Sequence, residues 1–329
     1  MQCYSVPADF KSETIKAYVR LNKKYGDKSI YETYGQITID NLYGSGRSFN
    51  LLPTVDFKTL KGYIALSAYY GIRFNYTMNS TCMGNMELTE NGKKNLESFF
   101  QKLYEVGVRS ITVALPSVIQ LIQSLSLDFE IKASAACRID NANKAEQYKQ
   151  LGANRIVIHE SIYRDFSVLS AICERFGKAT EIIVNSICHR NCIYQGFHFN
   201  QSSHENSYTS TASSSYYTHR CMLARSRTPG DFLKLAWIRP EDIHAYEKIG
   251  ITYFKIQGRH LTSTGNIPKT VECYLSGHYD GNLFYLLDCF APTNSFIPDI
   301  PNYSLKDFMH VFIKNNKFCK DNCIKCRYC

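Results

Sequence analysis

The feature that most constrains the fold of this chain is a regular alternation of short apolar runs with helical stretches. The helical stretches, such as NGKKNLESFFQKLYEVG and PEDIHAYEKIG, end in a glycine close to the next apolar run, as helix-to-strand connections prefer. Strands of a parallel sheet that is covered on both faces are continuously apolar, as most of these runs are. The pattern therefore predicts an α/β fold of the (β/α)8 TIM-barrel type. The predicted strands are residues 29–35, 71–79, 109–115, 129–136, 154–160, 181–187, 233–238 and 252–258.

Two departures from this alternation define the predicted domain organisation. The 329 residues fit one barrel, and we assign residues 1–290 to it. The connection 188–232 carries few helix signals, and its residues 200–219 are rich in Ser, Thr, Tyr and His. Loops of this length are usually functional or disordered, and we interpret this one as an insertion that carries metal-ligand cysteines. Residues 291–329 end in a cysteine-rich run and are predicted to form a C-terminal appendage that packs on the barrel.

The cysteine content indicates metal ligands and core thiols rather than a disulfide framework. The chain has 13 cysteines, an odd number, and its N-terminal residues lack the apolar run of a signal peptide. No segment has the apolar length of a membrane span, so we expect a cytoplasmic protein without a membrane partner. The net charge of +9 favours anionic partners, either nucleic acid or phosphorylated and carboxylated molecules, although it fits a moderately basic surface equally well.

Three cysteines of the insertion are predicted to bind a metal ion or an iron–sulfur cluster. Cys188 and Cys192 follow the strand-like run EIIVNS, and Cys221 follows a long polar loop. Thiolates that come together from a strand end and a loop are typical of such sites, and the spacing does not choose between ion and cluster. A fourth ligand would come from His244, Cys273 or the C-terminal cysteines. Without one, an iron would keep an open position for a substrate or small ligand.

Four cysteines at the C-terminus form a second candidate metal site. Lysine and arginine residues lie among them and would favour the thiolate form. Structural zinc is the alternative to iron–sulfur here, and the four could close a site alone or lend ligands to the insertion. Cys173 and Cys289 are predicted core thiols, while Cys82 and Cys137 lie either near the site or in ordinary core and loop positions. The C-terminal candidates are Cys319, Cys323, Cys326 and Cys329.

Polar side chains at the carboxyl ends of the predicted strands are the candidate catalytic residues, because TIM-barrel enzymes place their chemistry there. Glu160 and Asn185 would orient groups around a substrate. Arg239 and Arg259 would hold an anion through the bidentate geometry of the guanidinium group. The segment YGSGRS, which contains Arg47, could add an anion-binding nest.

The insertion also contains several histidines, and one of them could act as an acid or base, although solvated loop histidines are the commoner case. No G-x-S-x-G elbow, H-E-x-x-H motif or Walker loop occurs in the sequence. Serine-hydrolase, zincin and P-loop chemistry therefore lack support. The insertion histidines are His189, His198, His204 and His219.

Several runs of the chain resemble peptidase family U32 over roughly residues 30–290. The clearest are EIIVNSICHRNC, with Cys221 following, and FKIQGR near the last predicted strand. FNYTMNSTCMGN, SITVALPS and EIKASAACRIDNANKAEQYKQLGANRIVIHESIYRDF add to the resemblance. It is similar in particular to a divergent branch of the family with a cysteine-rich C-terminus.

The resemblance implies a barrel-like α/β fold and a four-iron, four-sulfur cluster held by the family's cysteines. Cys188, Cys192 and Cys221 match the cysteine-bearing segment. Some members are collagenase-like peptidases, and others are oxygen-independent hydroxylases that act in ubiquinone synthesis or on tRNA and rRNA, with prephenate as the proposed oxygen donor. The cysteine spacing departs from that of the hydroxylases, and His244 stands near the position of the last ligand, so the fourth ligand and the cluster type stay open.

The sequence therefore predicts a cytoplasmic iron–sulfur oxidoreductase of the U32 type. Its expected chemistry is redox or oxygen-independent hydroxylation on an anionic or RNA-linked substrate. A U32-type peptidase is the first alternative, and it lacks a recognisable nucleophile–base pair. A non-catalytic, metal-stabilised module that binds RNA through its basic tail is the second. The predicted partners are an anionic small-molecule substrate or donor, RNA, or another U32-family subunit.

Overall fold

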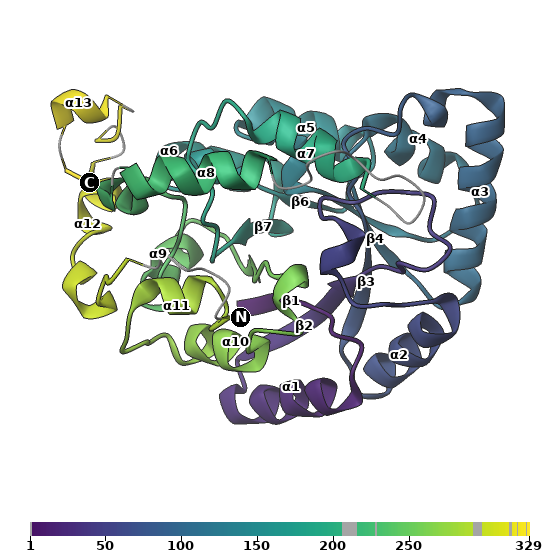
Figure 1. The fold of residues 1–329 in the computed structure, drawn as a ribbon, viewed down its shortest axis with the longest axis horizontal. Coiled ribbons are helices and arrows are strands. Elements are labelled where there is room, and N and C mark those ends of the chain that lie inside the picture. Colours follow the sequence, from purple (N-terminus) through teal and green to yellow (C-terminus); the bar gives the residue numbers. More distant parts are fainter. Residues whose placement is uncertain are drawn as a thin grey trace.

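The computed structural model describes residues 2–205, 216–227, 229–291, 298–315, 318–320, 322–326 and 328–329. Within these residues, parallel strands follow one another in chain order around a closed barrel (Figure 1). The predicted (β/α)8 fold class is thereby confirmed. The strands are β1 (Gln2–Pro7), β2 (Lys28–Gly35), β3 (Arg73–Met78), β4 (Ser110–Val113), β5 (Glu130–Ala133), β6 (Arg155–Val157), β7 (Thr180–Ile183) and β8 (Tyr253–Lys255).

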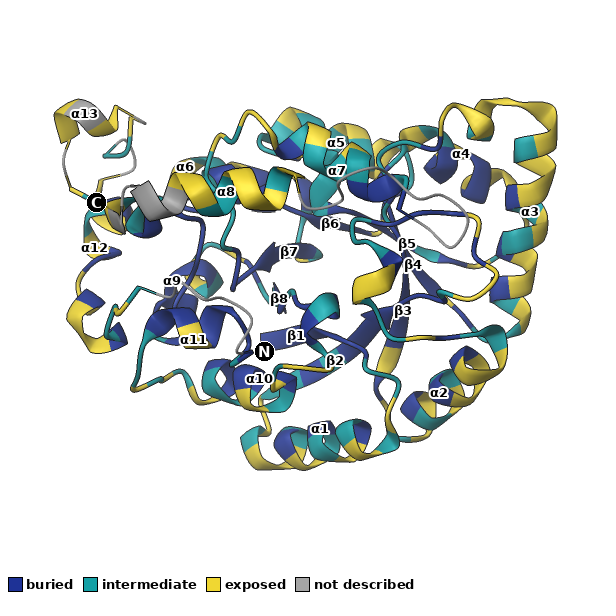
Figure 2. Cartoon of the chain, in the orientation of Figure 1, coloured by how far each residue is buried: buried dark blue, intermediate teal, exposed yellow. Residues whose placement is uncertain are grey.

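Helices surround the barrel, so the strands are buried while the outer faces of the helices are exposed (Figure 2). One helix follows each strand from β1 to β6, and two more flank β8. None of the described helices is both long and apolar enough to cross a membrane. The barrel helices are α1 (Ser12–Tyr25), α2 (Phe57–Tyr69), α3 (Glu90–Glu105), α4 (Pro116–Ser124), α5 (Ala142–Gln150), α6 (Phe166–Phe176), α9 (Ile243–Lys248) and α10 (Ile267–Ser276).

Side-chain caps explain where several of these helices begin. Each capping side chain accepts a hydrogen bond from a backbone N–H of the first turn that has no partner within the helix. The capping residues are Asp56 for α2, Thr89 for α3, Asn141 for α5, Asp165 for α6 and Asn266 for α10.

The remaining helices belong to the long β7–β8 connection and to the C-terminal segment. α7 (Gln195–Ser203) and α8 (Tyr216–Arg227) lie in the connection, and residues 206–215 between them are outside the described part of the chain. α11 (Leu283–Leu287), α12 (His310–Lys314) and α13 (Cys323–Cys326) follow the barrel. α7 and α8 lie within the predicted insertion 188–232, whereas α11 lies within the segment 1–290 that was assigned to the barrel.

One predicted strand is wrong, and one strand was not predicted. Seven predicted runs overlap β2 to β8, two of them starting one residue late, but β1 was missed and residues 233–238 are not a strand. Because Glu181 of β7 pairs directly with Tyr253 of β8, no strand fits between them. Residues 235–238 are instead buried beside the end of β7, where the N–H of Ile238 donates to the carbonyl of Val184 (2.8 Å). A short buried apolar run looks alike in sequence whether or not it forms a strand.

A cluster of charged side chains fills the interior of the barrel. Lys132 of β5 forms ion pairs with Glu32 of β2 and with Glu181 of β7 (2.8 Å), and all three side chains are fully buried. Arg155 of β6 lies 3.4 Å from Glu32 and 3.6 Å from Glu181. Burial alone would raise the pKa of Glu32, but the charges of Lys132 and Arg155 outweigh it and lower that pKa to about 2. The cluster therefore ties four strands of the barrel together.

Replacing Glu32 with Gln should lower the free energy of unfolding by about 3–5 kcal/mol, because it removes one partner of a buried ion-pair cluster. Unfolding in urea at pH 7 measures this change. The matched control is Glu272→Gln: Glu272 is ion-paired with Lys24 at the surface (2.7 Å), and its loss should change the stability far less, because water screens an exposed pair. Equal losses of stability in the two variants would contradict the prediction.

The same carboxylate should give the stability a defined pH dependence. The pKa of Glu32 is lowered in the folded protein, so the stability it contributes is present above the unfolded pKa of 4.5. The wild type should lose that contribution as the pH falls from 4.5 towards about 2, and Glu32→Gln should not. The difference in unfolding free energy between the two proteins should therefore shrink over this range.

Candidate functional site

A cavity of about 480 Å³ opens at the carboxyl ends of the strands, where barrel enzymes bind their substrates. Its floor includes Thr77 of β3, Ile183 of β7 and Lys255 of β8. The loop after β7 and the helices α7 and α8 line its other sides. The long connection between β7 and β8 therefore builds much of this site.

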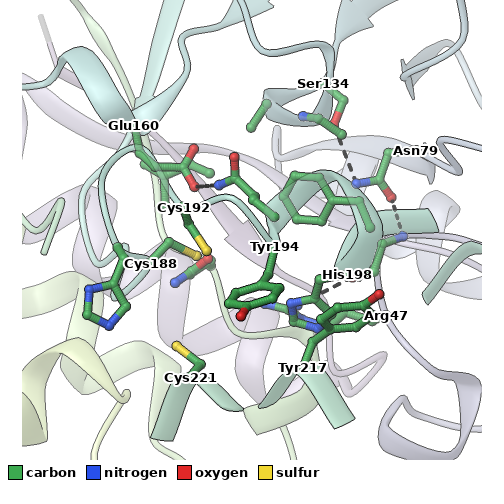
Figure 3. A pocket seen from close by; sticks show the side chains of 18 of the residues that line it. Arg47, Asn79, Ser134, Glu160, Cys188, Cys192, Tyr194, His198, Tyr217 and Cys221 are labelled. Atoms are coloured by element: carbon green, nitrogen blue, oxygen red, sulfur yellow. Dashed lines mark hydrogen bonds between the residues drawn. The ribbon is translucent and has the colours of Figure 1, made fainter. Parts of the chain in front are cut away.

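Three of the predicted ligand cysteines line this cavity together. Cys188 and Cys192 come from the loop after β7, and Cys221 comes from α8. Figure 3 shows the sulfur atoms of Cys188 and Cys192 next to each other, with the sulfur of Cys221 directed towards the same space from the opposite side. Thiols from two separate segments thus converge on one wall of the cavity.

The loop that carries Cys188 and Cys192 is attached to the rest of the protein by backbone contacts. The N–H of Ala236 donates to the carbonyl of Cys188 (3.3 Å), and His189 forms an isolated antiparallel bridge with Leu235. Nε of Arg190 donates to the carbonyl of Ser161 (2.9 Å). The buried segment that was predicted as a strand therefore serves to hold the cysteine loop at the end of β7.

Aromatic side chains of α7 and α8 lie beside the thiols (Figure 3). The rings of His198 and Tyr217 stack with centroids 5.8 Å apart, and Tyr194 lies 6.2 Å from Tyr217. Burial, together with the charge of Arg47, lowers the pKa of His198 to about 4, so its imidazole is neutral at pH 7. The contact between His198 and Tyr217 joins α7 to α8 beside the cavity.

Several cations line the cavity, and Arg47 and Arg259 are the two that the sequence predicted as anion-binding residues. Arg259 follows β8 and is buried, and Arg47 lies in the loop after β2. Arg259 donates to Gln36 Oε1, to Ser45 Oγ (3.2 Å) and to Asn79 Oδ1 (3.5 Å). Burial, together with the charge of Arg47, lowers the pKa of Arg259 to about 10, which still leaves the guanidinium protonated at pH 7. No carboxylate is ion-paired with either arginine in the described part of the chain.

Glycines allow the loop of Arg47 to approach the cavity. A Cβ on Gly44 would stand 1.7 Å from the carbonyl oxygen of Ser203 at the end of α7, so only glycine fits there. The N–H of Gly46 donates to Asn79 Oδ1 (3.0 Å), as Figure 3 shows. The predicted flexible segment is therefore a closely packed loop that holds Arg47 at the rim.

Glu160 lines the cavity, and a hydrogen bond from Gln195 fixes its carboxylate. Nε2 of Gln195 donates to its Oε1 (2.6 Å), and Oε1 of Gln195 lies 2.6 Å from Nε2 of His159. Nδ1 of His159 lies 2.6 Å from Ser161 Oγ, but neither His159 nor Ser161 lines the cavity. This His–Ser contact therefore positions the wall and does not present a nucleophile to the cavity.

Comparison with known proteins identifies the family. The sequence model of peptidase family U32 matches residues 26–277. The chain belongs to peptidase family U32. A curated relative from Methanocaldococcus jannaschii, described as "Uncharacterized protease MJ1657", is 29% identical over 330 residues, which cover 99% of this chain and 95% of the relative. The solved structure of the U32 peptidase Mk0906 aligns with a TM-score of 0.56 at 18% identity, covering 78% of this chain and 94% of that one, and it shows the same fold.

Two predicted catalytic residues of this U32 barrel do not line the cavity. Asn185 is fully buried: its Nδ2 donates to the carbonyl of Gln257 (2.9 Å), and its Oδ1 accepts from the N–H of Gln257 (2.8 Å). Arg239 is also buried and forms a two-pronged ion pair with Asp242 (2.7 and 2.9 Å). Asn185 joins the ends of β7 and β8, and Arg239 holds a neighbouring loop.

The proposed fourth ligands His244 and Cys273 also lie away from the cavity. His244 lines a separate groove with Phe166 and His310, and its Nδ1 is 2.7 Å from the carbonyl oxygen of Glu241. Cys273 lies on α10, packed against the core. Neither side chain stands beside the three thiols of the U32 cavity.

The four C-terminal cysteines of this U32 chain line a second cavity of about 880 Å³ with Lys234 and Lys325. Arginines from the barrel reach two of the sulfur atoms: Arg190 donates to Cys319 (3.2 Å) and Arg164 to Cys329 (3.6 Å). As placed, no three Cys, His, Asp or Glu side chains of the described chain converge closely enough to hold one metal ion. The C-terminal cysteines are thus gathered in one region without forming a closed single-ion site.

Sequence reasoning missed several charged residues of the U32 cavity, among them Arg190, Arg220 and Lys255. Lys255 is the last residue of β8 and lines the cavity together with Tyr34 of β2. Both Lys255 and Arg259 belong to the run FKIQGR, in which only the arginine was predicted as a site residue. A polar residue inside an apolar strand was the available signal, because the inward positions of a barrel strand near its carboxyl end face the site.

Alkylation of the metal-free native protein should separate the cavity cysteines from the core cysteines. Cys188, Cys192 and Cys221 line an open cavity, whereas Cys289 is fully buried and burial raises its pKa to about 12. At pH 8 the thiolate fraction of Cys289 should be on the order of a thousandfold below that of a free cysteine. Peptide mass spectrometry after timed iodoacetamide treatment, with urea-unfolded protein as control, measures the order of modification. Native Cys289 reacting as fast as Cys188 would contradict the described burial.

Proposed function

We propose that this U32 protein is an iron–sulfur-dependent oxidoreductase whose cluster binds in the barrel-mouth cavity to Cys188, Cys192 and Cys221. The observation that carries the proposal is the shared lining: the three thiols and the guanidinium groups of Arg47 and Arg259 border one cavity. Thiolates are the usual protein ligands of such clusters, and guanidinium groups bind carboxylates and phosphates. The arrangement suits redox chemistry on an anionic substrate.

Thiolates bind both zinc ions and iron–sulfur clusters, and the family resemblance favours a cluster in this cavity. The described Cys, His, Asp and Glu side chains form no group of three placed to hold a single ion. Cys188, Cys192 and Cys221 would bind three irons, and a fourth iron would take a different ligand or remain open to substrate.

The residues around the thiols suggest how a substrate would be held. Arg259, fixed by its contacts with Gln36 and Ser45, would bind a carboxylate or phosphate together with Arg47. Glu160, fixed by Gln195, would accept a hydrogen bond or a proton from the substrate. The cluster would supply electron transfer, and the family resemblance extends this to oxygen-independent hydroxylation.

Peptide hydrolysis is the second candidate function, because the curated relative is described as a protease. The cavity thiols are the nucleophile candidates for it. Cleavage of casein by metal-free protein, with loss of cleavage in Cys188→Ala, would support hydrolysis and contradict the redox proposal.

The C-terminal cysteines are proposed as a separate metal site. Lysines lie around them, and N–H groups of Arg190 and Arg164 reach Cys319 and Cys329. Burial raises the pKa of the Cys329 thiol although the charge of Arg164 opposes this, so a bound metal ion would have to displace its proton. Zinc would require these sulfurs to move together around one ion. An RNA-linked substrate, a partner subunit of the same family and a cytoplasmic location stay predictions of the sequence.

Protein purified without oxygen should contain about four iron and four sulfide per chain for the cavity cluster, with broad visible absorption. Cys188→Ala, Cys192→Ala and Cys221→Ala should each lose most of this iron and colour. Cys273→Ala is the matched control, because Cys273 lies on α10 outside the cavity, and it should keep both. Iron and sulfide analysis together with the visible spectrum measures the outcome.

Two results would contradict the cavity cluster. Stoichiometric zinc without sulfide would show that the cysteines hold a structural ion and not a cluster. Loss of iron in Cys323→Ala combined with retention in all three cavity variants would move the cluster to the C-terminal cysteines.

A further inference from the structure

Lys255 is a buried amine that faces the candidate cavity without a partner of its own. It is 8% exposed, lines the cavity, and its Nζ lies 3.9 Å from the centre of the Tyr34 ring. The hydroxyl of Tyr34 donates to the carbonyl of Ile256 (2.7 Å), so the ring is held against β8. In the described part of the chain, no carboxylate or carbonyl oxygen lies within hydrogen-bonding or ion-pairing distance of the Lys255 Nζ.

The two carboxylates of the ion cluster beneath Lys255 are already ion-paired with other cations. Glu32 and Glu181 are the fully buried carboxylates of the cluster, and Lys132 and Arg155 contact both of them. Lys255 is therefore a third cation above two paired ones. Burial first, and then the charge of Lys132, lower the pKa of Lys255 to about 7, with Arg259 lowering it further and the two glutamates opposing.

A substantial fraction of Lys255 is consequently an uncharged amine at neutral pH, which is the nucleophilic form. An ordinary lysine at this pH is almost entirely protonated. The amine faces the cavity. Arg259, four residues further along the chain, lines the same cavity and is positively charged.

We propose that Lys255 binds its substrate covalently, by condensing with the carbonyl group of a carboxylate-bearing compound such as a 2-oxo acid. The C–N bond forms as Nζ attacks the carbonyl carbon, and both amine protons leave with the carbonyl oxygen as water. One further proton from solvent gives the protonated imine, and nothing is oxidised or reduced. Arg259 and Arg47 hold the carboxylate, whose charge supplies the counter-ion that the imine nitrogen lacks among the protein groups.

This inference specifies a substrate class for the cavity of the proposed function. It rests on the proposed function only in taking that cavity as the active site. Condensation needs Lys255 and the arginines, and it does not need the thiols. The metal-free protein should therefore form the imine, so that failure of the cluster proposal and failure of this one give different results.

The experiment traps the imine on the full-length protein with pyruvate as the probe and cyanoborohydride as the reductant at pH 7. Reduction adds the mass of pyruvate less one oxygen atom to the modified lysine. Peptide mass spectrometry should find about tenfold or more adduct on Lys255 than on any surface lysine, because far more of its amine is unprotonated at this pH. The yield at Lys255 should rise with pH through a midpoint near 7, the pKa of this buried lysine.

Two variants make the test specific. Lys255→Arg keeps a positive charge at the end of β8 but cannot form an imine, and it should lose the dominant adduct. Lys269→Arg, an exposed lysine on α10, is the matched control and should keep it. Adduct spread over the surface lysines, or labelling unchanged in Lys255→Arg, would overturn the proposal and leave Lys255 as a group that only binds anions.

Discussion

The rest of the structure depends on the buried ion cluster at the centre of the barrel. Lys132 lies between Glu32 and Glu181, and Arg155 contacts both carboxylates, so side chains of β2, β5, β6 and β7 meet in one place. Charges in such a position are stable only when they are matched, because each unmatched charge carries a large desolvation cost. In these four groups two positive charges face two negative ones, although Arg155 Nε and Glu181 Oε1 have no hydrogen-bond partner in the described part of the chain. The next cation towards the cavity, Lys255, is not among the ion pairs of the described residues. The interaction that organises the barrel thus also sets the chemistry of the amine above it.

The cavity has a sulfur side and a cationic side, and they come from different parts of the fold. The cysteine loop and α8 belong to the long β7–β8 connection, whereas Arg259 and Lys255 belong to β8 and the residues that follow it. The buried segment 235–238 joins the two, because it binds the cysteine loop on one side and leads into α9 and β8 on the other. The aromatic contacts between α7 and α8 then complete the wall over the thiols.

The sequence predicted the barrel because its parallel strands are short, apolar and separated by helices, which is a local pattern. It missed β1 and misassigned 233–238, because β7–β8 pairing is a long-range property that no local pattern contains. The rule that barrel enzymes place site residues at strand ends selected Glu160 and Arg259, which line the cavity. The same rule selected Asn185 and Arg239, which do not line the cavity and form hydrogen bonds to neighbouring segments. Lys255 was missed because its importance depends on the charges of four other strands.

The charged groups on the sulfur side and on the cationic side of the cavity affect one another. Arg47, Arg190, Arg220 and Arg259 all line it, and Glu160 and Asp231 are the carboxylates among its described lining residues. An excess of cations in a site of low dielectric favours bound anions, whether they are metal-bound thiolates or a substrate carboxylate. Any such anion would oppose the effects of Lys132 and Arg259 on Lys255 and raise its pKa. A bound carboxylate therefore lowers the fraction of unprotonated amine before the attack and stabilises the charged imine after it, so the buried cations Lys132 and Arg259 are what keep part of the amine reactive when the substrate is in place.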